Sequence, residues 1–268
     1  MRIMQPLPRR QALLTALAAG IAVRHAKAAE DADPWPSLAK QIFDDRPIAD
    51  GKAILAIDAP YRAEDAAVVP VSVRSIGPSS TDVNGITLVI DQNPSPLAAK
   101  FFLGSNSGIR NISTCIRVDS YTNIHAVAET PDGNLVADQR FVKAAGGCSA
   151  PAAKQTADAI PLGTMRFRQF APGPDPDQHE AQLMIRHPNY SGMQMDQLTR
   201  LYVPAHFVSS IKIWQGDDLL LGIETGISIS ENPEFRFNYR PNGATTFHAA
   251  AEDNEGGSFK QSWSVTRA

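Results

Sequence analysis

Most of the chain alternates between apolar and polar residues with a period of two, which predicts short β-strands separated by turns. One amphipathic segment precedes this pattern, with Leu38, Ile42 and Phe43 on a single helical face. Ser37 is suited to cap that helix, and Pro47 ends it. Strands are then expected at 54–57, 68–73, 85–90, 99–103, 112–118, 124–129 and 135–143. Their number and spacing favour an immunoglobulin-like β-sandwich.

A segment of small residues, 144–164, interrupts the strand pattern near the middle of the chain. It has too few large apolar side chains to bury a core of its own, so we expect a mobile linker. Strand patterns resume at 164–170, 180–187, 202–208, 211–214, 219–225, 235–239, 245–250 and 259–265. We therefore predict an all-β protein with two immunoglobulin-like domains, 32–145 and 164–268, joined by a flexible linker at 146–163.

The first 28 residues have the organisation of a secretory signal peptide. Arg9 and Arg10 precede an uncharged apolar run at 12–23, and Ala26-Lys27-Ala28 places small residues where a signal peptidase cleaves. The arginine pair suits the twin-arginine route as well as general secretion, and both remain open. No later apolar segment approaches the about 20 residues of a membrane span. We expect an exported protein without a membrane span.

Removal of this segment makes the charge balance distinctly acidic. The whole chain has 25 Lys and Arg residues and 28 Asp and Glu residues, a net charge of −3. Residues 1–28 hold five of the basic residues and no acidic one, which leaves a net charge of −8. Such a surface argues against nucleic-acid binding, because that binding depends on Lys and Arg meeting phosphate.

Cys148, within Gly146-Gly147-Cys148, is the strongest candidate for chemistry. The two glycines remove side-chain obstruction and give the backbone wide freedom, so the thiol is expected to be reachable. No histidine adjoins it in sequence, and the nearest cations in sequence are Lys143 and Lys154. A thiol without a neighbouring base is suited to carry a group and poorly suited to catalysis, so we do not expect an enzyme.

The other candidates for chemistry are weaker. Cys115 lies in an alternating strand and is expected to be a packed, inert thiol, although a disulfide with Cys148 remains open. No phosphate loop, catalytic triad or paired carboxylates can be drawn, and no cofactor is expected. The histidines that occur singly in strands or turns show no metal-ligand spacing and are expected to be structural or solvated: His125, His187, His206 and His248.

Short motifs in both halves resemble a known pair of proteins. In the first half they are Trp35-Pro36-Ser37-Leu38, Asp45-Arg46-Pro47-Ile48, Ala67-Val68-Val69-Pro70-Val71, Gln92-Asn93-Pro94-Ser95-Pro96, Ile124-His125-Ala126-Val127-Ala128-Glu129 and Gly146-Gly147-Cys148. In the second half they are Ile185-Arg186-His187-Pro188, Val203-Pro204-Ala205-His206-Phe207-Val208, Ser230-Glu231-Asn232-Pro233 and Asp253-Asn254-Glu255-Gly256-Gly257. Residues 35–148 resemble SoxY, a sulfur carrier of periplasmic thiosulfate oxidation, and residues 164–265 resemble its partner SoxZ. The whole resembles a fused SoxY–SoxZ protein of the carrier group associated with quinoprotein dehydrogenases.

The resemblance implies two immunoglobulin-like domains that pair face to face, and a carrier role. It implies that Cys148 holds sulfur intermediates covalently, that Gly146 and Gly147 form its flexible arm, and that haem and other periplasmic oxidoreductases are the partners. The family's arm ends the chain, whereas here Ser149 continues into a second domain. Cys148 lies three residues beyond Ala145, a reach of at most about 10 Å, so it would be offered as a short loop.

Three hypotheses remain for the function. The first is a periplasmic, non-enzymatic carrier of sulfur intermediates on Cys148, with Sox-type or quinoprotein dehydrogenase enzymes and c-type cytochromes as partners. The second is an adaptor for a quinoprotein alcohol dehydrogenase and its cytochrome, in which the cysteine is dispensable. The third is a redox switch that uses a disulfide between Cys115 and Cys148. The sequence leaves open which cargo and enzymes are used, and whether the domains pair within one chain.

Overall fold

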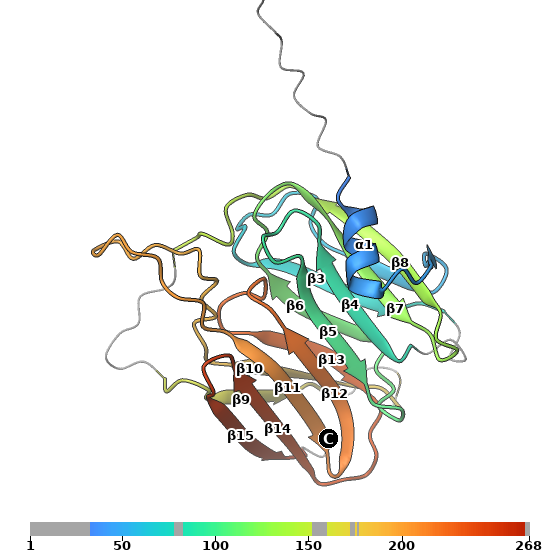
Figure 1. Ribbon diagram of the computed structural model, residues 1–268. Coiled ribbons are helices and arrows are strands. Elements are labelled where there is room, and N and C mark those ends of the chain that lie inside the picture. The colour runs from blue at the N-terminus through green and yellow to red at the C-terminus, as the bar shows by residue number, and fades with distance from the viewer. Residues whose placement is uncertain (1–32, 78–82, 152–159, 172–174, 176, 266–268) are drawn as a thin grey trace, which may run out of the picture. The chain divides into compact units, whose positions relative to one another are not determined.

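The computed structural model of the chain describes residues 33–77, 83–151, 160–171, 175 and 177–265 (Figure 1). The signal peptide expected at 1–28 lies outside these residues. By its internal contacts the chain divides into Met1–Pro34 and Trp35–Ala268, and the fold concerns the second unit.

The described residues form one helix and fifteen strands, which confirms the all-β prediction. In the first half these are α1 (Trp35–Phe43), β1 (Ile48–Asp50), β2 (Leu55–Asp58), β3 (Val69–Ser75), β4 (Gly85–Ile90), β5 (Leu97–Leu103), β6 (Asn111–Ile116), β7 (Thr122–Glu129) and β8 (Leu135–Val142). In the second half they are β9 (Met165–Gln169), β10 (His179–Ile185), β11 (Val208–Gln215), β12 (Asp218–Thr225), β13 (Glu234–Tyr239), β14 (Thr246–Asp253) and β15 (Ser258–Ser264).

The two halves of the chain share both of their sheets. One sheet has nine strands in the order β1-β8-β7-β4-β5-β12-β11-β14-β15, and the other has six in the order β2-β3-β6-β13-β10-β9. The halves meet where β5 pairs with β12 and β6 pairs with β13, both antiparallel. Pairing face to face, which the resemblance implied, is therefore wrong. The halves join edge to edge within one chain, and the free backbone groups of four edge strands are satisfied.

A single hydrophobic core runs between the two sheets across both halves. Phe101 of β5 and Phe235 of β13 meet edge to face, with ring centroids 6.2 Å apart. They come from opposite halves and opposite sheets, and both are buried. The alternating patterns of the two halves therefore supply one continuous core.

The strand predicted at 202–208 does not form, so that prediction is wrong. The segment between β10 and β11, orange in Figure 1, forms only isolated bridges from Tyr190 to His206 and from Met195 to Tyr202. Pro204 contributes to this outcome because it has no N–H for a ladder. The consequence is a long irregular connection, residues 186–207, that includes most of the segment expected as a strand.

The helix α1 lies on the outer face of the nine-stranded sheet, over β7 and β8 (Figure 1). It begins at Trp35, so Ser37 lies in its first turn and the capping role predicted for Ser37 is wrong. Asp44 and Asp45 end it, with φ angles of 52° and 60°. Phe43 packs against Val127 of β7 in a small second cluster. No helix among the described residues has the length and hydropathy to cross a membrane.

Candidate functional site

The Gly-Gly-Cys segment follows β8 and is held by backbone hydrogen bonds. The N–H of Gly146 donates to the carbonyl of Asp119 at 2.8 Å, and that of Gly147 donates to Val118 at 3.0 Å. A Cβ at position 147 would lie 2.0 Å from the Ala66 carbonyl oxygen, so only glycine fits there. In the described conformation these glycines are a packed turn and not the mobile arm expected from the sequence.

Cys148 is fully buried at the junction of the two halves. Its backbone carbonyl accepts a hydrogen bond from the hydroxyl of Ser191, in the irregular connection of the second half. The backbone carbonyl of Ala150, two residues further along, accepts a hydrogen bond from Gln194 Nε2 at 3.0 Å. The second half therefore caps the segment, and the freely accessible thiol expected from the sequence is not observed in this conformation. The expected linker residues 152–159 lie outside the described residues.

A buried arginine, Arg117, lies beside this segment, and sequence reasoning did not identify it. Its side chain is nearly fully buried, and Nη1 donates to the Gly147 carbonyl at 3.4 Å. Nη2 donates to the carbonyl of Asn189 at 3.2 Å, which reaches into the second half. A charged residue directly after the apolar strand β6 was the available signal. Its proximity to Cys148 depends on the fold and not on sequence spacing.

The charges around Cys148 act in opposite directions. Burial raises the pKa of the thiol from 9.0 to about 11, the carboxylate of Asp119 raises it further, and Arg117 lowers it. The thiol is therefore protonated at neutral pH in this conformation. Burial also lowers the pKa of Arg117, which is opposed by the charges of Cys148, Glu231 and Asp65.

Arg117 has hydrogen-bonding capacity that its protein partners do not use. Its two hydrogen bonds go to backbone carbonyls, and its Nε is buried without a hydrogen-bond partner. Among the described residues, no carboxylate lies within ion-pair distance of the guanidinium. Glu231 and Asp65 act on the guanidinium only from beyond that distance, so the site is suited to receive a negative group next to Cys148.

Polar side chains in or next to two of the quoted motifs join the halves near this site. Asn93 donates to the hydroxyl of Ser228 at 2.9 Å, and Ser228 in turn donates to the carbonyl of Ser95 at 2.8 Å. Ser230 donates to the carbonyl of Ala67 at 2.7 Å. These buried, satisfied bonds cross the junction, so the two motifs position the halves around Cys148.

Cys115 has a different environment from Cys148. It is partly exposed on the outer face of the six-stranded sheet, in a groove of about 620 Å³ that also contains Glu234. Its Sγ lies 3.8 Å from Glu234 Oε1, and burial followed by this carboxylate raises its pKa to about 11. Both cysteines are free in the structure. The raised pKa agrees with the inert thiol expected from the sequence, and the disulfide is not formed here.

Two of the four candidate histidines are structural. His125 is buried, stacks on Trp35 with ring centroids 3.6 Å apart, and pairs with Asp91 at 3.0 Å. His248 bonds to the hydroxyl of Ser262 at 2.9 Å. The prediction that the other two occur singly is wrong. The irregular connection brings His187 and His206 together, with ring centroids 4.5 Å apart.

Family models match both halves of the chain. The model of "Sulfur oxidation protein SoxY" matches residues 39–148, and that of "Sulphur oxidation protein SoxZ" matches residues 173–264. A search of curated proteins finds no match. Among solved structures, the superoxide reductase (neelaredoxin) from Ignicoccus hospitalis is similar with a TM-score of 0.30 and 14% identity. That similarity covers 40% of this chain and 90% of the other, and at this TM-score it carries no argument about function.

The SoxY match ends at Cys148, the residue that the two halves enclose. The SoxZ match contains the irregular connection that caps it. SoxY and SoxZ domains pair in sulfur-oxidation systems, and here they pair within one chain. The chain therefore carries a SoxY domain and a SoxZ domain in that order and is a fused member of the SoxYZ family of sulfur-oxidation carriers.

Proposed function

We propose that this protein carries sulfur intermediates covalently on Cys148 and presents them to partner oxidoreductases. The observation that supports this most directly is the enclosure of Cys148 at the domain junction beside Arg117, a buried cation whose two hydrogen bonds go to backbone carbonyls. SoxYZ domains are typically non-catalytic carriers. No histidine adjoins Cys148 in sequence, which is in keeping with that role.

Loading by thiosulfate is a two-electron oxidation. The Cys148 thiol and thiosulfate join through a new S–S bond, giving Cys148–S–S–SO₃⁻, one proton and two electrons. The electrons go to a haem-containing oxidoreductase or c-type cytochrome, and the proton goes to solvent. The product bears one negative charge on its sulfonate, which is the kind of group that the Arg117 guanidinium recognises through charge-assisted hydrogen bonds.

The buried conformation protects the thiol and its adduct between encounters. With its pKa raised to about 11, the enclosed thiol is a poor nucleophile at neutral pH. To react, residues 148–151 have to leave the cap and expose Cys148 as a loop, while the backbone bonds of Gly146 and Gly147 stay in place. The cap bonds from Ser191 and Gln194 each contribute about 1 kcal/mol, so exchange between covered and exposed states is accessible.

The periplasm is the proposed site of action. Sox carrier proteins are generally periplasmic, and the arginine pair and apolar run of residues 1–28 are suited to export. Partners of this carrier are c-type cytochromes and oxidoreductases of the Sox type or of a quinoprotein dehydrogenase system. A partner's pocket has to accept a loop, because the chain continues past Cys148 at both ends.

Intact mass of the protein, isolated from its native periplasm without reductant, tests the carrier role. We expect an added mass that reductant removes, and its value identifies the cargo. Cys148→Ser should abolish the adduct, whereas Cys115→Ser is the matched control and should retain it. An unmodified Cys148 after incubation with thiosulfate and an oxidising partner would contradict the proposal.

The burial of Cys148 also favours a second candidate function. The protein could serve as an adaptor between a quinoprotein alcohol dehydrogenase and its cytochrome, with the thiol dispensable. Co-purification of both proteins with Cys148→Ser, together with an unchanged rate of electron transfer, would support the adaptor. Loss of function in the same variant, with partner binding retained, would support the carrier.

A further inference from the structure

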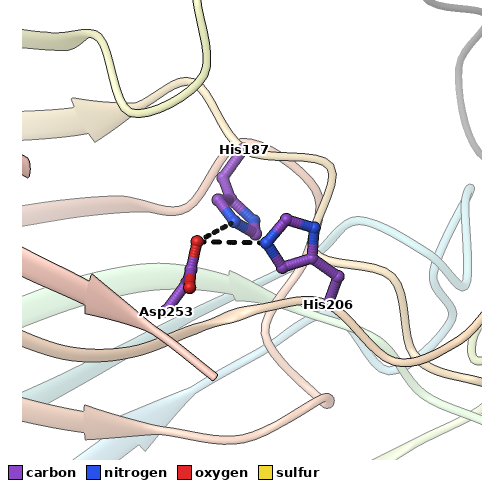
Figure 2. A group of neighbouring side chains, drawn as sticks. All are labelled: His187, His206 and Asp253. Atoms are coloured by element: carbon purple, nitrogen blue, oxygen red, sulfur yellow. Dashed lines mark hydrogen bonds and ion pairs between the residues drawn. The ribbon is translucent and has the colours of Figure 1, made fainter. Parts of the chain in front are cut away.

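Three side chains that are distant in sequence converge near the end of β10, the start of β11 and the end of β14, and Figure 2 shows them pointing toward one another. His187 lies two residues after β10, His206 lies two residues before β11, and Asp253 is the last residue of β14. His187 and Asp253 are buried, and His206 is partly exposed. The group thus joins both ends of the irregular connection to the β14–β15 hairpin.

Two of the distances between the three ligand atoms are close to those in a metal-ion coordination sphere. Asp253 Oδ2 lies 3.0 Å from His206 Nε2 and 3.6 Å from His187 Nε2. Two ligands at tetrahedral angles around Zn²⁺, with bonds of about 2.0–2.1 Å, are about 3.3 Å apart. The observed distances lie on either side of that value. All three atoms are within 4.8 Å of one another, so small side-chain shifts would complete the geometry.

The donor atoms are already oriented inward. The side chain of His187 is fully buried, and its Nε2 has no hydrogen-bond partner. The other carboxylate oxygen of Asp253, Oδ1, accepts bonds from the N–H groups of Glu255 at 2.9 Å and Gly257 at 2.7 Å. These bonds fix the carboxylate and leave Oδ2 directed at the two imidazoles, as second-shell bonds do in metal sites.

We propose that His187 Nε2, His206 Nε2 and Asp253 Oδ2 form a binding site for a divalent transition-metal ion, best suited to Zn²⁺. Two imidazoles and one carboxylate are ligands that Zn²⁺ prefers, whereas Mg²⁺ and Ca²⁺ prefer oxygen alone. Glu255 Oε2, 3.7 Å from His206 Nε2, is within reach as a fourth ligand on the exposed side. A water molecule can fill that position instead.

Binding requires a change of tautomer at His187. The N–H of Asn189 donates to His187 Nδ1 at 3.1 Å, so the neutral ring carries its proton on Nε2. An ion at Nε2 shifts that proton to Nδ1, and Asn189 loses its acceptor. This cost lowers the affinity by roughly tenfold relative to a site with a supporting acceptor at Nδ1. It also makes the amide of Asn189 a reporter of occupancy.

An ion here would fasten the connection that caps Cys148. Ser191 and Asn189 both lie between His187 and His206 along the chain, and both contact the Cys148 side of the junction. The metal site uses neither cysteine, so zinc binding can be measured without the carrier thiol. The metal proposal can therefore fail while the carrier proposal stands, and the carrier proposal can fail while the metal proposal stands.

Zinc titration of a thiol-free protein tests the site. Untagged chain with Cys115→Ser and Cys148→Ser, treated with chelator, is titrated with ZnCl₂ by calorimetry. One ion per chain is expected, with at least tenfold weaker binding after His206→Gln or Asp253→Asn. His248→Gln is the matched control and should bind normally. Circular dichroism checks that each variant is folded, and the more exposed His206 makes its variant the safer one.

NMR spectra of the backbone amides give a second readout that does not depend on affinity. Zinc should shift the Asn189 amide signal strongly in the parent protein and leave it in place in His206→Gln. Absence of saturable binding, or equal binding by the parent and both ligand variants, would overturn the proposal. Binding that disappears equally in His248→Gln would overturn it as well.

Discussion

The Ser191 hydroxyl of the SoxZ domain donates a hydrogen bond to the backbone carbonyl of Cys148, the last residue of the SoxY match. From the sequence, Cys148 was expected to be accessible because two glycines precede it. In the structure it is covered by the SoxZ domain of the same chain. Fusion keeps this cap permanently available, since the two domains cannot separate by dilution. Access to the Cys148 thiol in this conformation therefore depends on a local contact.

Loss of the cap should make Cys148 more reactive. Each of Ser191→Ala and Gln194→Ala removes one bond to residues 148–150, worth about 1 kcal/mol, and should speed alkylation of Cys148 about fivefold. Iodoacetamide labelling followed by mass spectrometry measures the rate at each cysteine. Ser209→Ala is the matched control, because its hydroxyl also donates to a carbonyl, that of Glu252, elsewhere in the fold. Unchanged labelling in both cap variants would show that the cap does not gate the thiol.

Adjacent glycines should respond very differently to alanine. A Cβ at position 147 would overlap the Ala66 carbonyl at 2.0 Å, so Gly147→Ala should cost more than about 3 kcal/mol of unfolding free energy. Gly146 has a φ of +78° and no atom closer than 4.0 Å to a new Cβ, so Gly146→Ala should cost only about 1 kcal/mol. Urea denaturation measures both. Equal costs would mean that the turn is not packed as described.

Removal of the buried cation should weaken retention of an anionic adduct. Arg117→Met deletes the guanidinium beside Cys148, and enclosing a sulfonate without a cation is unfavourable. The fraction of protein that carries thiosulfate-derived mass should fall at least tenfold, as measured by intact mass at equal loading time. The control is Arg236→Met, which removes an arginine paired with Glu180 on the surface. Normal loading of folded Arg117→Met would exclude this role.

Acid should destabilise the protein through His187. Burial, followed by the charge of His206, lowers the pKa of His187 from 6.5 to about 4, against the opposing effects of Asp253 and Asn189. The unfolded chain then binds more protons than the folded one as pH falls below 6.5. Stability present above pH 6.5 is lost as pH falls toward 4, by up to about 3 kcal/mol.

Urea midpoints between pH 7 and pH 4.5 measure this loss. His187→Gln should be less stable at neutral pH and have a smaller dependence on pH. His248→Gln should keep the full dependence, because His248 lies away from the cluster and bonds to Ser262. An unaltered dependence in His187→Gln would assign the loss to other groups.

The two domains should unfold as one cooperative unit. They share both sheets through β5·β12 and β6·β13 and share a core around Phe101 and Phe235. Halves co-expressed as 33–151 and 160–265 should therefore elute together in gel filtration, and the intact chain should show one calorimetric transition. Two transitions, or separate elution of the halves, would show that the junction is weak.

Much of the fold follows from local pattern. All seven strands expected in the first half and seven of the eight in the second occur in the structure, because alternation with period two defines a half-buried strand. The short β1 was missed, since three residues carry too little pattern, and the strand at 202–208 was wrong. Edge-to-edge pairing of the halves was not foreseen, because alternation identifies a strand's faces and says nothing about its neighbours.

The candidate site divides in the same way. The sequence by itself determined the residue types, the order of the two domains and the identity of Cys148 as the distinctive thiol, because these are properties of motifs along the chain. Only the tertiary structure decided that Arg117 and Ser191 enclose Cys148, and that His187, His206 and Asp253 form one group. These partners are tens of residues apart, and strand pairing across the junction brings them together. Distances of a few ångströms between such residues are set by sheet topology and core packing, which a linear pattern does not encode.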